Sequence, residues 1–272
     1  MNIRSIKSIA IGSFDGIHQG HMKLIQQVDA VVIIEKKNKE FITPGYKRWE
    51  FIKKPSFFYN ISNIFSMTPK EFIESLLKDF PFLEKIVVGY DFYFGHQKAG
   101  DTSMLRKLFK KDVIVVDEFK LDAVSVHSKV IKSLISSGEI KKANKFLNRE
   151  YEMQGTVIKG QGLGAKELVP TINLKVYNYI LPKDGVYLTK TKIENEWLWS
   201  VSFIGKRVST DGSFAIETHI IDRDITLRED EIEIAFVDFM RDNHRFESLE
   251  KLKMQIHRDI NHCKEMIEAY ER

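Results

Sequence analysis

The segment SIAIGSFDGIHQGHMKLIQQV, residues 8–28, passes from a short apolar run to an amphipathic stretch through a glycine-containing turn. A continuous run rich in β-branched residues is typical of a strand that is buried on both faces of a parallel sheet. Gly12, Gly16 and Gly20 let backbone amides approach a ligand closely. The segment therefore predicts a strand, a turn and a helix in succession, which is the opening of a doubly wound α/β domain.

The same alternation continues to about residue 150. Further strand-like runs lie at 31–35, 85–89 and 113–117. A helix is predicted over 68–80, because Thr68 can cap it, Pro69 takes the first helical position and Glu71 completes a capping box. A second helix is predicted from 128 to 138. Residues 36–66 show no clear period, and we expect an irregular excursion there.

The pattern changes near Tyr151, where short strand-like segments begin, separated by Gly, Pro, Asn and Asp. They lie at 153–160, 171–176, 185–193, 197–205, 215–222 and 231–240. This spacing predicts a small antiparallel barrel or sandwich, of which we adopt the barrel. A long helix over 248–271, with Ser248 as N-cap, would pack one apolar stripe on it. The change of periodicity predicts two domains, 1–150 and 151–272.

Composition limits the classes of protein to consider. The formal net charge of +4 in 272 residues suits anionic small ligands and falls well short of a nucleic-acid footprint. The single cysteine, Cys263, excludes an internal disulfide and fits a reducing compartment. No apolar stretch approaches the roughly 20 residues that span a bilayer. We expect a cytoplasmic protein with neither a nucleic-acid nor a membrane partner.

Two histidines, His18 and His21, follow the glycine-containing turn. A helix N-terminus favours anions through its free N–H groups and its dipole, and imidazoles can donate to phosphate oxygens. In an isolated His-x-x-His, two surface histidines in a turn would be the simpler explanation. The glycines and the strand-to-helix position favour a phosphate site instead.

Three blocks of the first half resemble a known family. GSFDGIHQGH (12–21) resembles the nucleotidyltransferase motif G-x-F-D-G-x-H-x-G-H of bacterial bifunctional riboflavin kinase/FMN adenylyltransferases, also called FAD synthetases. The segments 87–101 and 123–151 resemble the second and third blocks of that family, and the resemblance covers nearly the whole chain. It implies a Rossmann-like N-terminal domain that transfers AMP from ATP to FMN, giving FAD and pyrophosphate, and a C-terminal riboflavin kinase domain.

The resemblance also implies residue roles in the first domain. His18 and His21 would bind the ATP phosphates, and Mg²⁺ would neutralise the triphosphate. The nucleotide pocket would be shaped by the turn residues Gly12, Ser13, Phe14, Asp15 and Gly16. Asp91 and Phe94 would line the flavin and adenylate cleft. Lys132 stands where the family has its phosphate-binding arginine, and no Pro-His-Pro follows the second strand. Lysine keeps the charge without a two-pronged contact.

The segment GQGLGAKELVPTINL (160–174) is rich in glycine and ends in Pro-Thr-x-Asn. The hydroxyl of Thr171 and the carbonyl oxygen of Asn173 can serve a hard cation. The stretch resembles the riboflavin kinase motif of the same family, which implies that Thr171 and Asn173 bind Mg²⁺. It also implies a flap over ATP that is formed by Gly160, Gly162 and Gly164.

Transfer of a phosphoryl group to a hydroxyl needs a carboxylate to accept the proton. Glu217 would share one face of a strand with His219, while Ile216 and Thr218 take the other. A carboxylate in a mostly apolar strand should be paired or used. The family has its catalytic base at the glutamate of V-E-x-H-x-x-D, which residues 217–222 match. Arg241 matches a further segment and would bind the flavin, whereas Phe203 replaces a family asparagine.

The sequence thus predicts an enzyme that makes FMN from riboflavin and FAD from FMN, with ATP as co-substrate and Mg²⁺ as cofactor. Two alternatives stay open. One is a riboflavin kinase whose first domain is degenerate. The other is a flavin- or nucleotide-binding regulator without catalytic activity.

Overall fold

The computed structural model describes residues 5–36, 40–45, 47–160 and 168–271. The chain divides into two compact units, Met1–Val130 and Ile131–Arg272. Each unit has its own sheet, which is open and parallel in the first and closed and antiparallel in the second. The predicted fold class, an α/β domain followed by a small barrel with a long terminal helix, is confirmed.

The first unit is built on a five-stranded parallel sheet of order β3-β2-β1-β4-β5. The strands are β1 (Ser8–Gly12), β2 (Ala30–Glu35), β3 (Ser56–Asn60), β4 (Lys85–Gly89) and β5 (Asp112–Val116). The helices are α1 (Gln19–Ile25), α2 (Lys47–Ile52), α3 (Ile61–Ile64), α4 (Pro69–Asp79) and α5 (Thr102–Leu108). A 3-10 turn, His96–Lys98, and a small hairpin of β6 (Lys120–Leu121) and β7 (Val124–Ser125) complete it.

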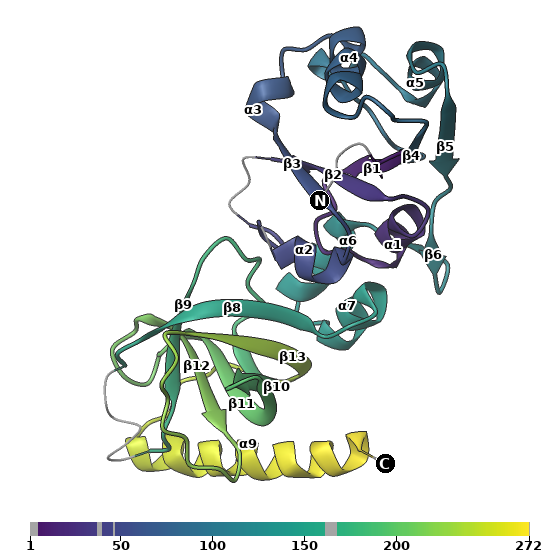
Figure 1. Ribbon diagram of the computed structural model, residues 1–272. Helices are drawn as coiled ribbons and strands as arrows, with labels where there is room; N and C mark the ends of the chain where they lie inside the picture. Colours follow the sequence, from purple (N-terminus) through teal and green to yellow (C-terminus); the bar gives the residue numbers. More distant parts are fainter. Residues whose placement is uncertain (1–4, 37–39, 46, 161–167, 272) are drawn as a thin grey trace. The chain divides into compact units, whose positions relative to one another are not determined.

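Both faces of this sheet are covered, as the unbroken apolar runs indicated. Ile9 and Ile11 of β1 pack in one cluster with α4 and α5, whereas Ala10 packs in another with α1 and α2. Figure 1 shows these two pairs of helices on opposite faces of the sheet. The capping box of α4 forms as predicted, because Glu71 N donates to Thr68 Oγ1 and the Glu71 carboxylate accepts from Thr68 N.

The irregular excursion expected over 36–66 is wrong for much of its length. β3 pairs in parallel with β2 in a register that places Ser56 opposite Val31, and α2 and α3 flank it. As an edge strand, β3 has no fully buried residue, and its aromatic and polar side chains lack the continuous β-branched run of the central strands. The pattern of hydrophobic periodicity therefore does not predict a strand at this position.

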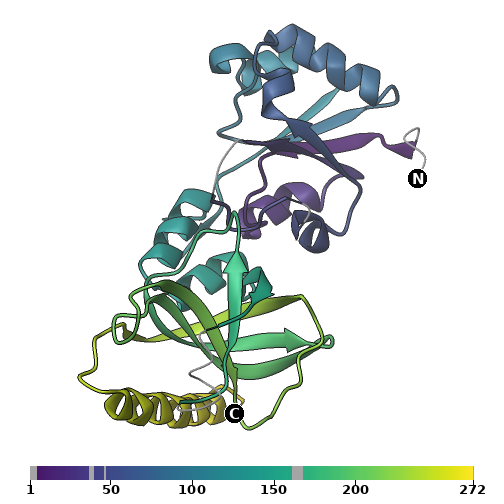
Figure 2. The same ribbon diagram turned by 90° about the vertical axis from the view of Figure 1, so that its left-hand side faces the viewer.

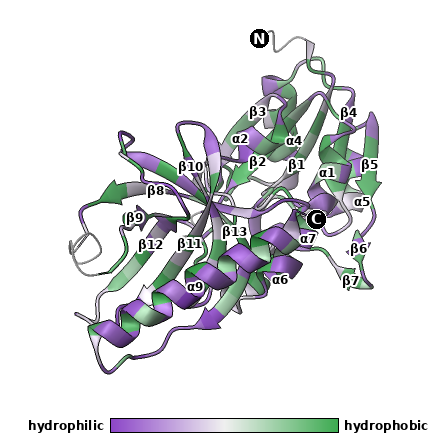
Figure 3. Ribbon diagram, turned by 90° about the horizontal axis from the view of Figure 1, so that it is seen from below, coloured by the Kyte–Doolittle hydropathy of each residue, from purple (hydrophilic) through white to green (hydrophobic). Residues whose placement is uncertain are grey.

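The second unit is a closed six-stranded antiparallel barrel of order β10-β11-β12-β9-β8-β13 (Figure 2). Its strands are β8 (Tyr151–Ile158), β9 (Ile172–Val176), β10 (Gly185–Ile193), β11 (Glu196–Lys206), β12 (Phe214–Ile220) and β13 (Glu231–Asp242). The terminal helix α9 (Leu249–Tyr270) begins at the N-cap Ser248. Hydrophobic and hydrophilic residues alternate along α9 (Figure 3), and its buried Ile260 and Cys263 pack on the barrel.

The boundary between the two compact units lies between residues 130 and 131, which is 20 residues before the predicted domain boundary between 150 and 151. Most of α6 (Ser128–Ser136) and all of α7 (Ile140–Leu147) belong to the second unit. The Asn144 amide of α7 explains this, because it donates to Phe236 O at 2.7 Å and accepts from Tyr151 N at 2.8 Å. α7 is thereby tied to β13 and β8.

A circuit of hydrogen-bonded hydroxyl groups crosses the barrel interior. Its five members, all with no exposed surface, are Thr189, Thr191, Ser200, Ser202 and Thr218. Each is linked to the next by 2.7–2.9 Å: Thr189 to Ser200, Ser200 to Thr191, Thr191 to Thr218, Thr218 to Ser202 and Ser202 to Thr189. These side chains alternate with outward residues on β10, β11 and β12, so that the barrel centre is polar yet satisfied.

Thr218→Val tests the contribution of this circuit to stability. Valine keeps the shape but removes the hydroxyl that links Thr191 to Ser202, leaving buried polar groups short of a partner. We expect the free energy of unfolding to fall by about 1–3 kcal/mol, measured by urea denaturation. The exposed Thr156→Val on β8 is the matched control, and an equal effect of the two substitutions would contradict the prediction.

Candidate active sites

The turn between β1 and α1 is held in an unusual backbone conformation. Phe14 and Ile17 have positive φ angles of 48° and 42°, and both side chains are buried. Asp15 is buried too, and its Oδ1 accepts backbone hydrogen bonds from Ile42 at 2.9 Å and Thr43 at 3.1 Å. Asp15 therefore binds the segment that follows β2 and fixes the turn to it.

His18 and His21 lie together at the start of α1. Their rings stack with centroids 3.6 Å apart, and His18 caps the helix by accepting from His21 N at its Nδ1. Because Nδ1 accepts, a neutral His18 carries its proton on Nε2. His18 is only 5% exposed, which excludes the simple explanation of two surface histidines. The two histidines are therefore held in place by the stacking of their rings and by the helix cap.

The second block (87–101) continues from the carboxyl end of β4, and the third block (123–151) follows the segment after β5. Asp91 follows β4 and is exposed, whereas Phe94 is 6% exposed and packs in the core beside Phe72. The burial of Phe94 favours a packing role over the predicted flavin contact. From the third block, Ser128 Oγ donates to Asp15 O at 2.7 Å, which joins the third block to the first. Lys132 falls in the second compact unit.

A polar cluster beside these blocks was not found from the sequence. The Tyr90 hydroxyl donates to Glu118 Oε1 at 3.1 Å and lies 3.0 Å from His127 Nε2. Hydrogen bonds from Ser125 and Lys120 lower the pKa of Glu118 to about 2. Tyr90 and Glu118 each follow a parallel strand, so the rule that loops meet at the carboxyl edge of such a sheet was the available signal.

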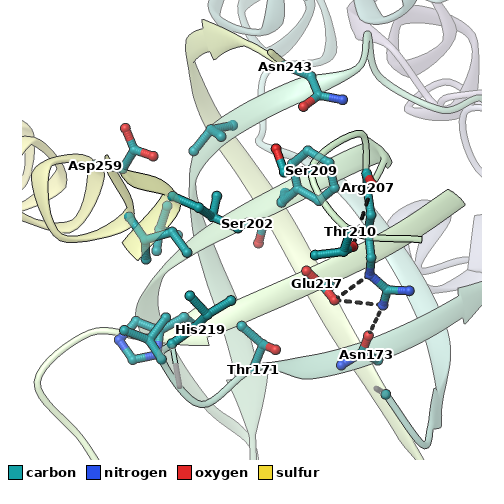
Figure 4. A pocket seen from close by; sticks show the side chains of 18 of the residues that line it. Thr171, Asn173, Ser202, Arg207, Ser209, Thr210, Glu217, His219, Asn243 and Asp259 are labelled. Carbon is teal, nitrogen blue, oxygen red and sulfur yellow. Dashed lines mark hydrogen bonds and ion pairs between the residues drawn. The ribbon is translucent and has the colours of Figure 1, made fainter. Parts of the chain in front are cut away.

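A cavity of about 370 Å³ lies on the outer face of the barrel, between its strands and α9. Its wall includes five residues predicted for the second site: Gly160, Thr171, Asn173, Glu217 and Arg241. Strand pairing explains why distant motifs meet, because Glu217 of β12 lies directly opposite Asn173 of β9. Thr171 stands just before β9, and His219 Nδ1 contacts Pro170 O at 2.7 Å (Figure 4). The predicted alternation is confirmed, since Ile216 and Thr218 are buried on the other face.

Arg207 is a cavity residue to which the sequence analysis assigned no role. Its Nε and Nη2 donate to Glu217 Oε1 at 3.0 and 2.7 Å, and Nη2 also donates to Asn173 Oδ1 at 2.7 Å (Figure 4). It lies in the segment FIGKRVS (203–209), of which the sequence analysis considers only Phe203. Phe203 itself pairs with Glu217 across β11 and β12 and lines the cavity.

Arg241 makes a two-pronged ion pair with Asp259 of α9. Nε lies 2.9 Å from Oδ1 and Nη2 lies 2.6 Å from Oδ2, and Asp259 is 6% exposed. The pair joins β13 to α9 at the cavity wall. The predicted contact of Arg241 with flavin stays a prediction, and its observed contact is structural.

Gly160 enters the cavity wall next to Asn173, and a methyl group at this position would collide with the Asn173 amide. Gly162 and Gly164 lie outside the described residues. Among the residues that the structure describes, no three His, Cys, Asp or Glu side chains gather to hold a metal ion.

Comparisons with known proteins assign a family to the chain. A family model for riboflavin kinase matches residues 147–267, and one for FAD synthetase matches residues 56–133. A bifunctional riboflavin kinase/FMN adenylyltransferase from Buchnera aphidicola subsp. Acyrthosiphon pisum is 31% identical over 95% of this chain and 94% of its own. The chain belongs to this bifunctional family. The Pseudomonas fluorescens member is 27% identical over 92% of this chain and 89% of its own.

The likeness extends to solved structures. A crystal structure from Streptococcus pneumoniae, described as a macrolide-efflux protein, superposes with a TM-score of 0.85 at 25% identity over 97% of both chains. In the described part of this family member, no helix is both long enough and apolar enough to cross a bilayer.

Proposed function

We propose that this chain performs both reactions of its family, one in each unit. The barrel phosphorylates riboflavin to FMN with ATP, and the α/β unit transfers AMP from ATP to FMN, which gives FAD and pyrophosphate. The observation that carries the proposal is the meeting of Glu217 with Asn173 and Thr171 in one cavity, from motifs more than 40 residues apart.

In the barrel, Glu217 accepts the proton of the riboflavin 5′-hydroxyl as that oxygen attacks the γ-phosphorus of ATP. The new O–P bond forms while the bond to the β-phosphate oxygen breaks, and ADP leaves. The side chain of Glu217 is partly buried in the cavity wall, which shields the carboxylate from water only in part and leaves it open to a bound substrate.

The donor set of this wall fits Mg²⁺, which prefers oxygen ligands and takes one or two from the protein with the rest from phosphates and water. The Thr171 hydroxyl and the Asn173 carbonyl oxygen would hold it. When bound with ATP, magnesium neutralises charge on the triphosphate. The absence of a cluster of three acidic or histidine ligands in the described chain agrees with a cation shared with nucleotide.

In the α/β unit, no covalent intermediate is needed, and catalysis consists of positioning and charge stabilisation. The stacked His18 and His21 stabilise the phosphate charge that builds up as FMN attacks the α-phosphorus of ATP. Asp15 supports them, because it fixes the turn to Ile42 and Thr43 while Ser128 holds its carbonyl group.

We place the protein in the cytoplasm, in keeping with a lone thiol. Cys263 of α9 is buried against the barrel, and burial raises its pKa to about 12, so the thiol is unreactive at neutral pH.

The test is to incubate the pure protein with riboflavin, ATP and magnesium chloride and to separate the flavins by chromatography. We expect FMN first and then FAD. If FMN accumulates and no FAD forms, even when FMN is supplied directly, the protein is a kinase whose first unit is inactive. A protein that forms neither product overturns the proposal.

Gly160→Ala tests the assignment of the cation ligands. The added methyl group would displace the Asn173 amide, and a displacement of about 1 Å can cost roughly 100-fold in rate. We expect kcat for riboflavin phosphorylation to fall by about that factor. FAD formation from supplied FMN is the internal control and should keep its rate. Equal losses in both reactions would contradict the assignment.

A further inference from the structure

The guanidinium of Arg207 lies between the two parts of the barrel site. It donates twice to Oε1 of Glu217, and Nη2 is shared with Oδ1 of Asn173. The side chain of Arg207 is 15% exposed and that of Glu217 is 23% exposed, so water screens the pair only in part. One cation thus bridges the proposed base and a proposed magnesium ligand (Figure 4).

The turn that joins β11 to β12 fixes the orientation of Arg207 through contacts other than those with Glu217 and Asn173. Nη1 donates to Ser213 Oγ at 2.9 Å, and Ser213 in turn donates to Asp211 at 2.8 Å. The backbone closes the same turn, because Arg207 N donates to Ser213 O at 2.9 Å and Gly212 N donates to Arg207 O at 3.1 Å. The guanidinium therefore has an anchor that does not depend on Glu217.

The two bonds to the base end on the same oxygen, Oε1. In the described part of the chain, Oε2 of Glu217 accepts no hydrogen bond. A carboxylate that is held by one oxygen presents the other in a defined direction, which is what transfer of a proton from a bound hydroxyl requires.

The bond to Asn173 has a different consequence. Oδ1 of Asn173 is the atom that would coordinate magnesium, and it already accepts from a cation at 2.7 Å. A divalent ion at its usual distance of about 2.1 Å would lie within a few ångströms of Nη2, and like charges repel strongly at that range. The two cations therefore compete for this oxygen.

We propose that Arg207 is a positioning residue for riboflavin phosphorylation: it holds Glu217 by Oε1 and occupies Oδ1 of Asn173 until magnesium takes that oxygen. The inference rests on the proposed roles of Glu217 and Asn173. Binding of magnesium with nucleotide breaks the bond to Asn173 and leaves the bonds to Glu217 and Ser213, so the base stays aligned when the cation arrives.

Arg207→Met, which removes the charge at similar length, is the main test, with Arg223→Met as matched control. Arg223 pairs with Glu196 on the exposed surface, outside the cavity. The first measurement is calorimetry of ADP binding across magnesium chloride concentrations, which needs no turnover. The second is the steady-state kinetics of riboflavin phosphorylation.

Without the competing cation, the magnesium concentration for half-maximal ADP binding is expected to fall about tenfold in Arg207→Met. Loss of alignment should lower kcat by about 10- to 100-fold. KM for riboflavin should stay within about twofold, because Arg207 aligns the base rather than the flavin. Arg207→Lys keeps one charge but cannot bridge both partners, and we expect intermediate values for both quantities.

An unchanged magnesium requirement, or a kcat equal to that of the wild type, overturns the proposal. If Arg207→Met does not fold, as judged by thermal unfolding, Arg207→Lys carries the same two measurements. If the wild-type protein forms no FMN, the proposed function fails by itself, and the magnesium dependence of ADP binding still decides whether Arg207 competes with the metal.

Discussion

Replacing Glu217 by Gln is expected to lower the rate of FMN formation by about 10²- to 10⁴-fold, the usual contribution of a general base. The amide cannot accept the proton of the riboflavin hydroxyl. Its oxygen can still accept the bonds from Arg207, so the cavity should keep its shape. FAD formation from supplied FMN should continue, because the base lies only in the barrel. Both rates are measured by chromatography of the flavins.

Glu231→Gln on β13 is the matched control. Glu231 is exposed and accepts from Gln154 at 2.9 Å, outside the cavity, so the same chemical change there should leave both reactions intact. A Glu217→Gln protein that phosphorylates riboflavin at nearly the wild-type rate would show that another group accepts the proton.

His21→Ala should reduce FAD formation from FMN by about 10²- to 10³-fold, as expected for the loss of one donor to the developing phosphate charge. FMN formation from riboflavin should be unaffected. His21 is the better position for this test, since the substitution keeps the backbone N–H that His18 accepts. His18→Ala would remove the helix cap as well, at a cost of about 1 kcal/mol in stability.

His96→Ala provides the control in the same unit, because His96 is exposed and contacts the Phe65 carbonyl oxygen. The two reactions are measured separately, with riboflavin or FMN as the starting flavin. A large loss of kinase activity in His21→Ala would mean that the two reactions are assigned to the wrong units.

Much of the fold follows from local patterns. The central strands β1, β2 and β4 coincide with continuous apolar runs, because both of their faces are buried. The edge strand β5 has a similar run of β-branched residues, although it is only partly buried. The edge strand β3 has only partly buried or exposed residues, and its short aromatic run has neither the β-branched continuity nor the alternation that predicts a strand. The change of periodicity places α7 in the first domain, whereas its Asn144 bonds to Phe236, 92 residues along the chain, and such a contact is not visible in a local pattern.

The motif residues of the barrel site come together as expected, while their partners could not be foreseen. Glu217 and Asn173 meet through the register of β12 against β9, which no local pattern specifies. Arg207 reaches both from a turn, and Tyr90, Glu118 and His127 join from three loops. A hydrogen bond between loop side chains leaves no periodic trace in the sequence.

The α/β unit, the barrel and the terminal helix are predictable from the amino-acid sequence, since burial periodicity and short motifs are local properties. The same motifs supply the candidate residues of the two sites. Three features follow from tertiary contacts alone: the oxygen by which Glu217 is held, the ion pair of Arg241 with Asp259, and the burial of Phe94. Side-chain pairing depends on strand register and turn geometry, and these are set by contacts over the whole unit.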